Sequence, residues 1–98
     1  MMTNEQVSEL FKEYRRTGDK NIRNKLVENY MYIAEILAKK FAGRGVEYDD
    51  LLQVASEALI LGVEKFDPSL GNQFTTYVTP TITGMIKNYF RDYSRSVR

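Results

Sequence analysis

The chain has 98 residues, 43% of them hydrophobic, with 14 Lys or Arg, 13 Asp or Glu, and no His or Cys. This length is enough for one domain, residues 1–98, that buries a core without metals or disulfides. The lack of His and Cys removes imidazole bases, thiol nucleophiles and the usual zinc ligands. We therefore expect no enzyme and no metal or cofactor.

The amino end, TNEQVSELFKEY, is too polar for a signal peptide. No apolar run approaches the roughly 20 residues that a membrane span needs, and the absence of Cys is typical of a reducing compartment. A soluble cytoplasmic protein with no membrane partner is expected.

Charge is distributed unevenly along the chain. Residues 1–80 carry ten Lys or Arg and twelve Asp or Glu, whereas residues 81–98 carry four and one. The net charge is therefore −2 before residue 81 and +3 after it. The carboxyl-terminal end is the part that favours a polyanionic partner.

Apolar residues at helical spacing predict two helices in the first 43 residues. Thr3 and Gln6 form a capping box for a leading helix within residues 1–18, and Gly18 supplies its stop. Asp19 caps a long scaffold helix over residues 19–43. Its apolar positions are Ile22, Leu26, Tyr30, Ile33, Ala34, Leu37, Ala38 and Phe41.

The end of the scaffold helix carries Lys39 and Lys40, which complement the helix dipole, so we favour a structural role over a ligand role. Gly43-Arg44-Gly45 then predicts a tight turn between helices. A phosphate loop is disfavoured because no strand precedes the glycines and no Lys-Ser or Lys-Thr pair follows them.

A central helix is predicted over residues 48–67, with Asp49 as its N-cap and Pro68 as its stop. One face is apolar and predicts core. The other face mixes carboxylates with two aliphatic side chains, which suits either docking on a basic helical partner or plain solvent exposure. The apolar face holds Leu51, Leu52, Ala55, Ala58, Leu59, Val63 and Phe66, and the mixed face holds Asp50, Gln53, Val54, Glu57, Leu61 and Glu64.

A fourth helix is predicted over residues 74–93, capped by Thr75 or Thr76, with Pro80 in its first turns. Ile82, Met85, Ile86, Tyr89 and Phe90 form its apolar stripe. Lys87, Arg91 and Arg95 repeat every four residues on another face, where they either follow a phosphate backbone or are solvated. With no strand pattern, the fold expected is an all-α bundle of four helices.

Four blocks between Lys25 and Asp92 together resemble the second region of bacterial RNA polymerase sigma factors of the housekeeping-type superfamily. They are KLVENYMYIAEILAKKF, GRGVEYDDLLQVASEALILGVEKFDP, GNQFTTYVTPTI and GMIKNYFRD. The order is that of the family's scaffold, polymerase-docking, promoter-melting and promoter-reading segments. GRGVEYDDL and the ending YFRD are most similar to the sporulation, general-stress and flagellar branch.

The resemblance implies two sets of contacts, with core RNA polymerase and with promoter DNA. The first set would meet a coiled coil of the largest polymerase subunit, and the second the non-template strand of the opened minus-ten element, with an anti-sigma factor as a further candidate partner. For Phe66, a wall of a base pocket and a plain core position are equally open. The polymerase residues are Asp50, Gln53, Val54, Glu57 and Leu61, and the DNA residues are Phe66, Phe74, Thr76, Tyr77, Lys87, Asn88 and Arg91.

The chain departs from the family pattern at several positions. Ala55 and Ala58 replace small glycines and should still pack closely. Pro80 and Thr81 replace a tryptophan pair, and Met85 replaces a common Glu, so stacking at the upstream edge and sequence preference do not carry over. No third or fourth region follows before Arg98, as expected of an excised domain or a truncated member.

The function expected is that of a sigma domain that binds core polymerase and recognises and melts the minus-ten element. One alternative is a helix-turn-helix regulator that reads duplex DNA, which the acidic face of the central helix disfavours. Another is a protein-interaction module that melts no DNA, against which the basic ridge of the fourth helix is a weak argument.

Overall fold

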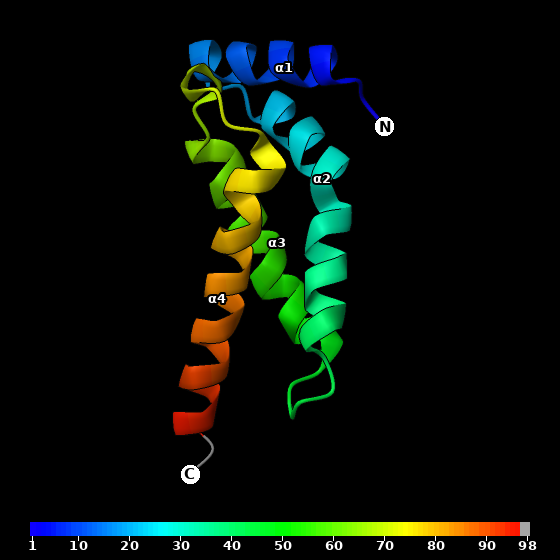
Figure 1. Ribbon diagram of the computed structural model, residues 1–98, viewed down its shortest axis with the longest axis vertical. Coiled ribbons are helices and arrows are strands. Elements are labelled where there is room, and N and C mark those ends of the chain that lie inside the picture. Colours follow the sequence, from blue (N-terminus) through cyan, green and yellow to red (C-terminus); the bar gives the residue numbers. More distant parts are fainter. Residues whose placement is uncertain (97–98) are drawn as a thin grey trace.

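The computed structural model describes the backbone of residues 1–96 and the side chains of residues 1–93. This part of the chain folds into four α-helices and one short 3₁₀ helix, with no strand among them (Figure 1). The all-α fold expected from the sequence is confirmed. The elements are α1 (Asn4–Thr17), α2 (Lys20–Phe41), α3 (Tyr48–Lys65), η1 (Pro68–Leu70) and α4 (Phe74–Ser96).

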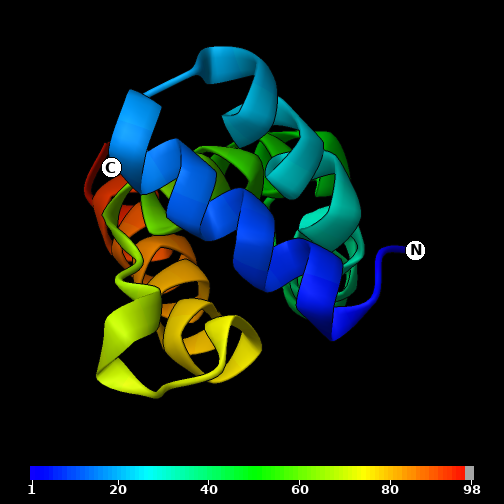
Figure 2. The same ribbon diagram turned by 90° about the horizontal axis from the view of Figure 1, so that it is seen from above.

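Three helices run side by side and the first lies across one end of them. Figures 1 and 2 show α2, α3 and α4 along the length of the molecule, with α1 crossing the end where α2 begins and α3 finishes. The turn between α2 and α3 and the last turns of α4 lie at the opposite end. The bundle therefore has an end covered by α1 and an end without it.

The helix signals at the amino end are confirmed. Thr3 Oγ1 accepts a hydrogen bond from the Gln6 N–H at 3.1 Å, and Gln6 Oε1 accepts one from the Thr3 N–H at 2.9 Å. Gly18 ends α1 with a φ of 69°, which costs a glycine little. Asp19 Oδ1 accepts from the Asn21 N–H at 2.8 Å and so caps α2.

Some predicted helix ends were wrong. The N-cap residue of α3 is Glu47, which makes no side-chain cap bond, so Asp49 lies in the first turn beside Asp50. Both carboxylates still face the positive end of the helix dipole. α2 ends at Phe41, two residues before Gly43, where positive φ angles begin at the two glycines of the turn.

α4 begins at Phe74 as predicted, but its predicted caps were wrong. Because α4 begins at Phe74, Thr75 and Thr76 lie within its first turn and are not its caps. Pro80 is then in the second turn, where its ring nitrogen has no hydrogen to donate to the carbonyl of Thr76. The side chain of Thr79 donates to the carbonyl of Thr75 at 2.7 Å, one position away.

Small residues bring α3 and α4 close together. Ala55 and Ala58 are fully buried, which confirms the close packing expected of them. A Cβ added to Gly62 would lie 2.5 Å from Cγ2 of Val78 on α4. The two helices therefore meet at a separation that only glycine permits at this position.

We predict that Gly62→Ala destabilises the fold, because the new methyl group overlaps Val78. Overpacking of this kind costs about 1–3 kcal/mol, which exceeds the gain of up to about 1 kcal/mol from better helix propensity. Urea unfolding measures the change, and pairing the variant with Val78→Ala should recover part of the loss.

Gly84→Ala is the matched control. Gly84 also lies inside a helix, in this case α4, but an added Cβ there would have nothing within 4 Å. It should stabilise the chain by up to about 1 kcal/mol. Equal stability of the two variants would contradict the close approach of α3 and α4.

Candidate docking face and nucleic-acid interface

The mixed face of α3 is exposed, as the sequence predicts. Asp50, Gln53 and Glu57 are exposed, Val54 is half-buried, and Leu61 is 40% exposed. On the opposite face, Leu51 and Leu59 have no exposed surface, which fixes the orientation of the helix. Within the described side chains, Asp50, Gln53 and Glu57 make no ion pair or side-chain hydrogen bond, so their polar groups remain available to a partner.

Glu64, the last residue of that face, is already engaged. Its Oε2 lies 3.1 Å from Nη1 of Arg23 on α2, and both side chains are partly buried. This ion pair joins α2 to α3 near the end covered by α1. We therefore define the docking face as Asp50, Gln53, Val54, Glu57 and Leu61, without Glu64.

Five aromatic rings from four segments meet where α4 begins, and we call them the aromatic cluster. The ring of Phe74 lies 4.6 Å from Tyr30, 5.2 Å from Phe11, 5.3 Å from Phe66 and 6.5 Å from Tyr77, measured between centroids. Such separations and tilted or edge-to-face orientations are favourable for aromatic pairs. The cluster connects α1, α2, the end of α3 and the first turn of α4.

The inner members of the cluster are core residues. Phe66 and Phe74 are only 5% and 4% exposed, so the core alternative for Phe66 holds, and the ring of Phe74 has no free face for a base. Tyr77 is half-buried at the edge, 5.4 Å from Phe66, and Thr76 is exposed. Of the residues predicted around a captured base, only Thr76 and Tyr77 lie at the surface.

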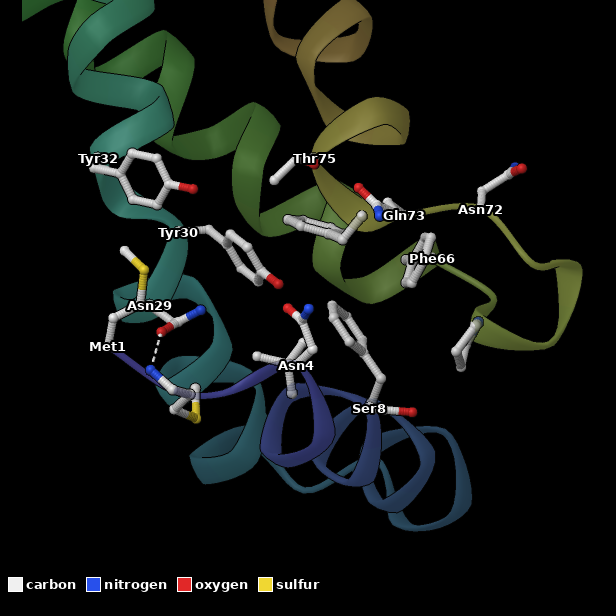
Figure 3. Close-up of a pocket in the computed structure, with 15 residues that line it drawn as sticks. Met1, Asn4, Ser8, Asn29, Tyr30, Tyr32, Phe66, Asn72, Gln73 and Thr75 are labelled. Carbon is white, nitrogen blue, oxygen red and sulfur yellow. Dashed lines mark hydrogen bonds between the residues drawn. The ribbon is translucent and has the colours of Figure 1, made fainter.

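A cleft of about 390 Å³ opens beside the cluster, between α1, α2 and the segment that leads into α4. Figure 3 shows the side chains of Asn4 and Tyr30 pointing into this space from opposite helices, with Thr75 and Gln73 on the side of α4. Its walls combine aromatic rings with amides and hydroxyls. The polar lining residues are Asn4, Ser8, Asn29, Tyr30, Tyr32, Asn72, Gln73 and Thr75.

The polar lining of the cleft was missed in the sequence. Tyr30 was predicted only as part of the apolar stripe of its helix, and Asn29 was not singled out. The available signal was the pair of amides, Asn4 and Asn29, on helices that also carry core residues. Asn29 is held in place because its Oδ1 accepts a hydrogen bond from the Met2 N–H at 3.0 Å.

Burial in the cleft raises the pKa of the Tyr30 phenol above its ordinary value of 10.0, and the neighbouring Tyr32 adds to the shift. A low-polarity environment disfavours the phenolate. The hydroxyl of Tyr30 is therefore a hydrogen-bond donor and acceptor throughout the neutral range.

The basic ridge lies further along α4. Lys87, Asn88 and Arg91 are exposed, while Ile86 is fully buried on the core side of the same helix. Arg91 Nε lies 3.4 Å from Oδ1 of its neighbour Asp92. The side chain of Arg95 and the whole of Arg98, which the sequence adds to this basic end, lie outside the described residues.

α1 is attached to the segment that follows α3. Nη1 of Arg15 donates to the carbonyl of Phe66 at 3.4 Å, and Nη2 lies 3.9 Å from Asp67. The hydroxyl and N–H of Ser69 donate to Asp67 and, together with Arg15, lower the pKa of its carboxyl. These contacts hold α1 against the aromatic cluster.

The fold and its surfaces define an all-α domain with an exposed acidic face on α3 and a separate aromatic and basic region on α4. The family described as Sigma-70 region 2 matches residues 26–96. The chain therefore belongs to the sigma-70 region 2 family, which confirms the resemblance seen in the sequence.

Several curated proteins are similar to this chain. RNA polymerase sigma factor SigF of Mycobacterium tuberculosis is 40% identical over 76 residues, which cover 78% of this chain and 29% of that protein. The RNA polymerase sigma-G factor of Bacillus subtilis is 35% identical over a match that covers 100% of this chain and 40% of that protein. A putative RNA polymerase sigma-G factor of Bacillus thuringiensis is 34% identical over a match that covers 100% of this chain and 82% of that protein.

The chain thus spans between 29% and 40% of the length of the first two relatives. In the described part of the chain, no helix is both long enough and apolar enough to cross a membrane. No group of three or more acidic side chains is gathered there as a metal site.

We predict that the folding stability of the chain falls above about pH 10 in part because Tyr30 resists ionisation in the fold. A group whose folded pKa is raised contributes stability that is complete below its unfolded pKa and is lost as the pH rises through the folded value. Tyr30→Phe should therefore lose less stability than the parent between about pH 9 and pH 11.

Urea unfolding at a series of pH values measures this difference. Tyr93→Phe is the control, because it removes a phenol outside the cleft, from a residue that is 39% exposed at the far end of α4. Parallel curves for Tyr30→Phe and the parent would contradict the burial of the phenol in the cleft.

Proposed function

We propose that this chain is the part of an RNA polymerase sigma factor that binds core polymerase and recognises and opens the minus-ten promoter element. The observation that carries the proposal is the family match over residues 26–96, combined with two chemically different surfaces on neighbouring helices. Such a factor acts in the cytoplasm and leaves catalysis to the polymerase.

The docking face of α3 is proposed to bind a basic coiled coil of the largest polymerase subunit. Asp50 and Glu57 offer carboxylates and Gln53 an amide, none of them engaged within the described part of the chain. Val54 supplies apolar surface between these polar side chains, and Leu61 supplies more beyond Glu57. Charged groups around an apolar centre are the arrangement expected of a specific interface.

The first turn of α4 is proposed to hold an unpaired base of the non-template strand. Tyr77 offers a ring that rests on Phe66, so its outer face can stack on a base without further reorganisation. The cleft beside the aromatic cluster supplies amides and hydroxyls of the kind that recognise base edges. In this assignment Phe66 and Phe74 support the site from the core, and Thr76 and Tyr77 make the contacts.

Lys87, Asn88 and Arg91 are proposed to contact the DNA backbone. They lie 10 to 14 residues beyond Tyr77, about 15 to 21 Å along the helix. Cations at this distance would anchor the strand whose bases reach the aromatic cluster. An anti-sigma factor is a further candidate partner, and the docking face is the surface it would compete for.

We predict that Asp50→Arg weakens association with core polymerase, because a charge-assisted contact in a docked interface is replaced by repulsion. The loss should be a few kcal/mol, and Gln53→Ala should give a smaller loss. A pull-down with core polymerase measures it. Thermal unfolding of Asp50→Arg should shift no more than that of Asp49→Arg, because each variant replaces one exposed carboxylate in the first turn of α3.

Asp49→Arg is the matched control, since Asp49 is an exposed acid in the same turn but about 100° around the helix. It should bind core polymerase almost as the parent does. Equal binding by Asp50→Arg and the parent would show that the docking face is assigned wrongly.

We predict that Tyr77→Ala lowers the affinity for single-stranded minus-ten DNA by roughly 1–3 kcal/mol, the contribution of one base stacked on a ring. Tyr77→Phe should keep most of the affinity, because the ring face supplies the contact. Affinity for duplex DNA should hardly change, which also separates this function from that of a duplex reader.

Single-strand binding and thermal melting should be measured on the same samples, because Tyr77 is half-buried. Tyr93→Ala removes an exposed ring from the other end of α4 and serves as the control. If Tyr77→Ala lowers the melting temperature but leaves single-strand affinity unchanged, Tyr77 has a structural role and does not bind a base.

A further inference from the structure

Two cations outside the predicted sites are held on one ring at the end of the bundle opposite α1. Lys40 Nζ lies 5.9 Å from the centroid of Phe41, and Arg44 Cζ lies 5.4 Å from it. Both distances are within the range of cation–π attraction. Lys40 is in the last turn of α2 and Arg44 in the turn that follows, so the ring gathers charge from two segments.

The same ring connects these cations to the basic ridge. The centroid of Phe41 lies 6.3 Å from that of Phe90 on α4. Lys87 precedes Phe90 by three residues and Arg91 follows it directly. One ring contact therefore joins the segment that carries Lys40 and Arg44 to the part of α4 that carries Lys87 and Arg91.

These cations have little to neutralise them. Lys40, Arg44 and Lys87 are exposed, and none of them pairs with an acid among the side chains that the structure describes. Among the side chains of residues 1–93, the acid that Arg91 meets is its neighbour Asp92. The helix dipole accounts for a cation at the end of α2 but not for Arg44, which lies beyond the helix.

We propose that Lys40 and Arg44 form, with Lys87 and Arg91, a two-sided site for the phosphate backbone of duplex DNA that flanks the unpaired segment. The proposal rests on the proposed function, to which it adds a second contact surface. Lys40 and Arg44 lie on the Phe41 side of the Phe41–Phe90 contact, and Lys87 and Arg91 lie on the Phe90 side. Two groups of cations can bind phosphates at more than one position along a duplex.

Duplex DNA is favoured over an unpaired strand because the ring that gathers these cations offers no face to a base. Phe41 is 8% exposed and its ring faces Phe90, so a base has no free face on which to stack there. The 15 to 21 Å between Tyr77 and the basic ridge corresponds to about 4 to 6 base pairs at 3.4 Å each. A duplex that ends near the aromatic cluster would therefore reach these cations.

The test compares binding of the full chain to two DNA probes over about 50 to 200 mM salt. One probe joins a duplex to a single-stranded minus-ten tail, and the other is the tail alone. The variant is Lys40→Gln with Arg44→Gln. The matched control is Lys20→Gln with Lys39→Gln, which removes the same charge from exposed positions of α2. Lys39 lies about 100° around the helix from Lys40.

Each phosphate contact contributes about 0.9 to the slope of log affinity against log salt. The Lys40→Gln, Arg44→Gln variant should therefore lose about 1.8 units of slope on the junction probe, so that its affinity relative to the parent changes roughly tenfold across the salt range. Binding of this variant to the tail alone should match that of the parent. The Lys20→Gln, Lys39→Gln control should change the slope on the junction probe by less than the about 0.9 units of one phosphate contact.

A Lys87→Gln, Arg91→Gln variant keeps the two proposals apart. If it loses slope while the Lys40, Arg44 variant does not, the two-sided site is wrong and the proposed function stands. An equal loss with the control pair, or an equal loss on the tail alone, would also overturn the two-sided site. If the parent chain binds neither probe, the proposed function itself fails.

Discussion

The aromatic cluster around Phe74 is the contact on which the arrangement of the molecule depends. Its rings come from α1, α2, the end of α3 and the first turn of α4, so a single buried ring positions four segments. Aromatic pairs are favourable only over narrow ranges of distance and angle. The start of α4, the loop before it and the cleft beside it are therefore set together, and a displacement of α1 would alter all three.

α3 connects the two proposed surfaces because it contributes to both sides of the bundle. Its buried face meets α4 at Gly62 and Val78, where no larger side chain fits, and its exposed face carries the docking residues. Partners bound to α3 and to α4 would thus share one rigid contact. Close packing leaves little room for one helix to shift against the other, so docking on the first would fix where the second is presented.

Much of the proposed docking face could be predicted from the sequence, and much of the proposed DNA site could not. Helical periodicity separates core from surface along α3, because each residue advances by a fixed angle. The exposure of Asp50, Gln53 and Glu57 follows from that rule alone. Periodicity places Phe66 on the core face of α3 but does not say which residues cover its ring, and Phe74 lies at a helix start, where periodicity gives neither. The rings that cover them include Phe11 of α1 and Tyr30 of α2, which no local pattern places beside them.

The sequence by itself determined the four helices, their caps at Thr3 and Asp19, the family, and the sign of charge along each helix, since all of these depend on residues close together in the chain. Tertiary structure alone decided which helix faces meet. It showed that Glu64 is engaged by Arg23, that Phe66 and Phe74 belong to the core, and that Phe41 brings Lys40 and Arg44 to the basic ridge. Apart from the contacts of Lys40 and Arg44 with Phe41, these contacts join residues 8 to 63 positions apart. Local patterns do not encode which distant residue fills a given space.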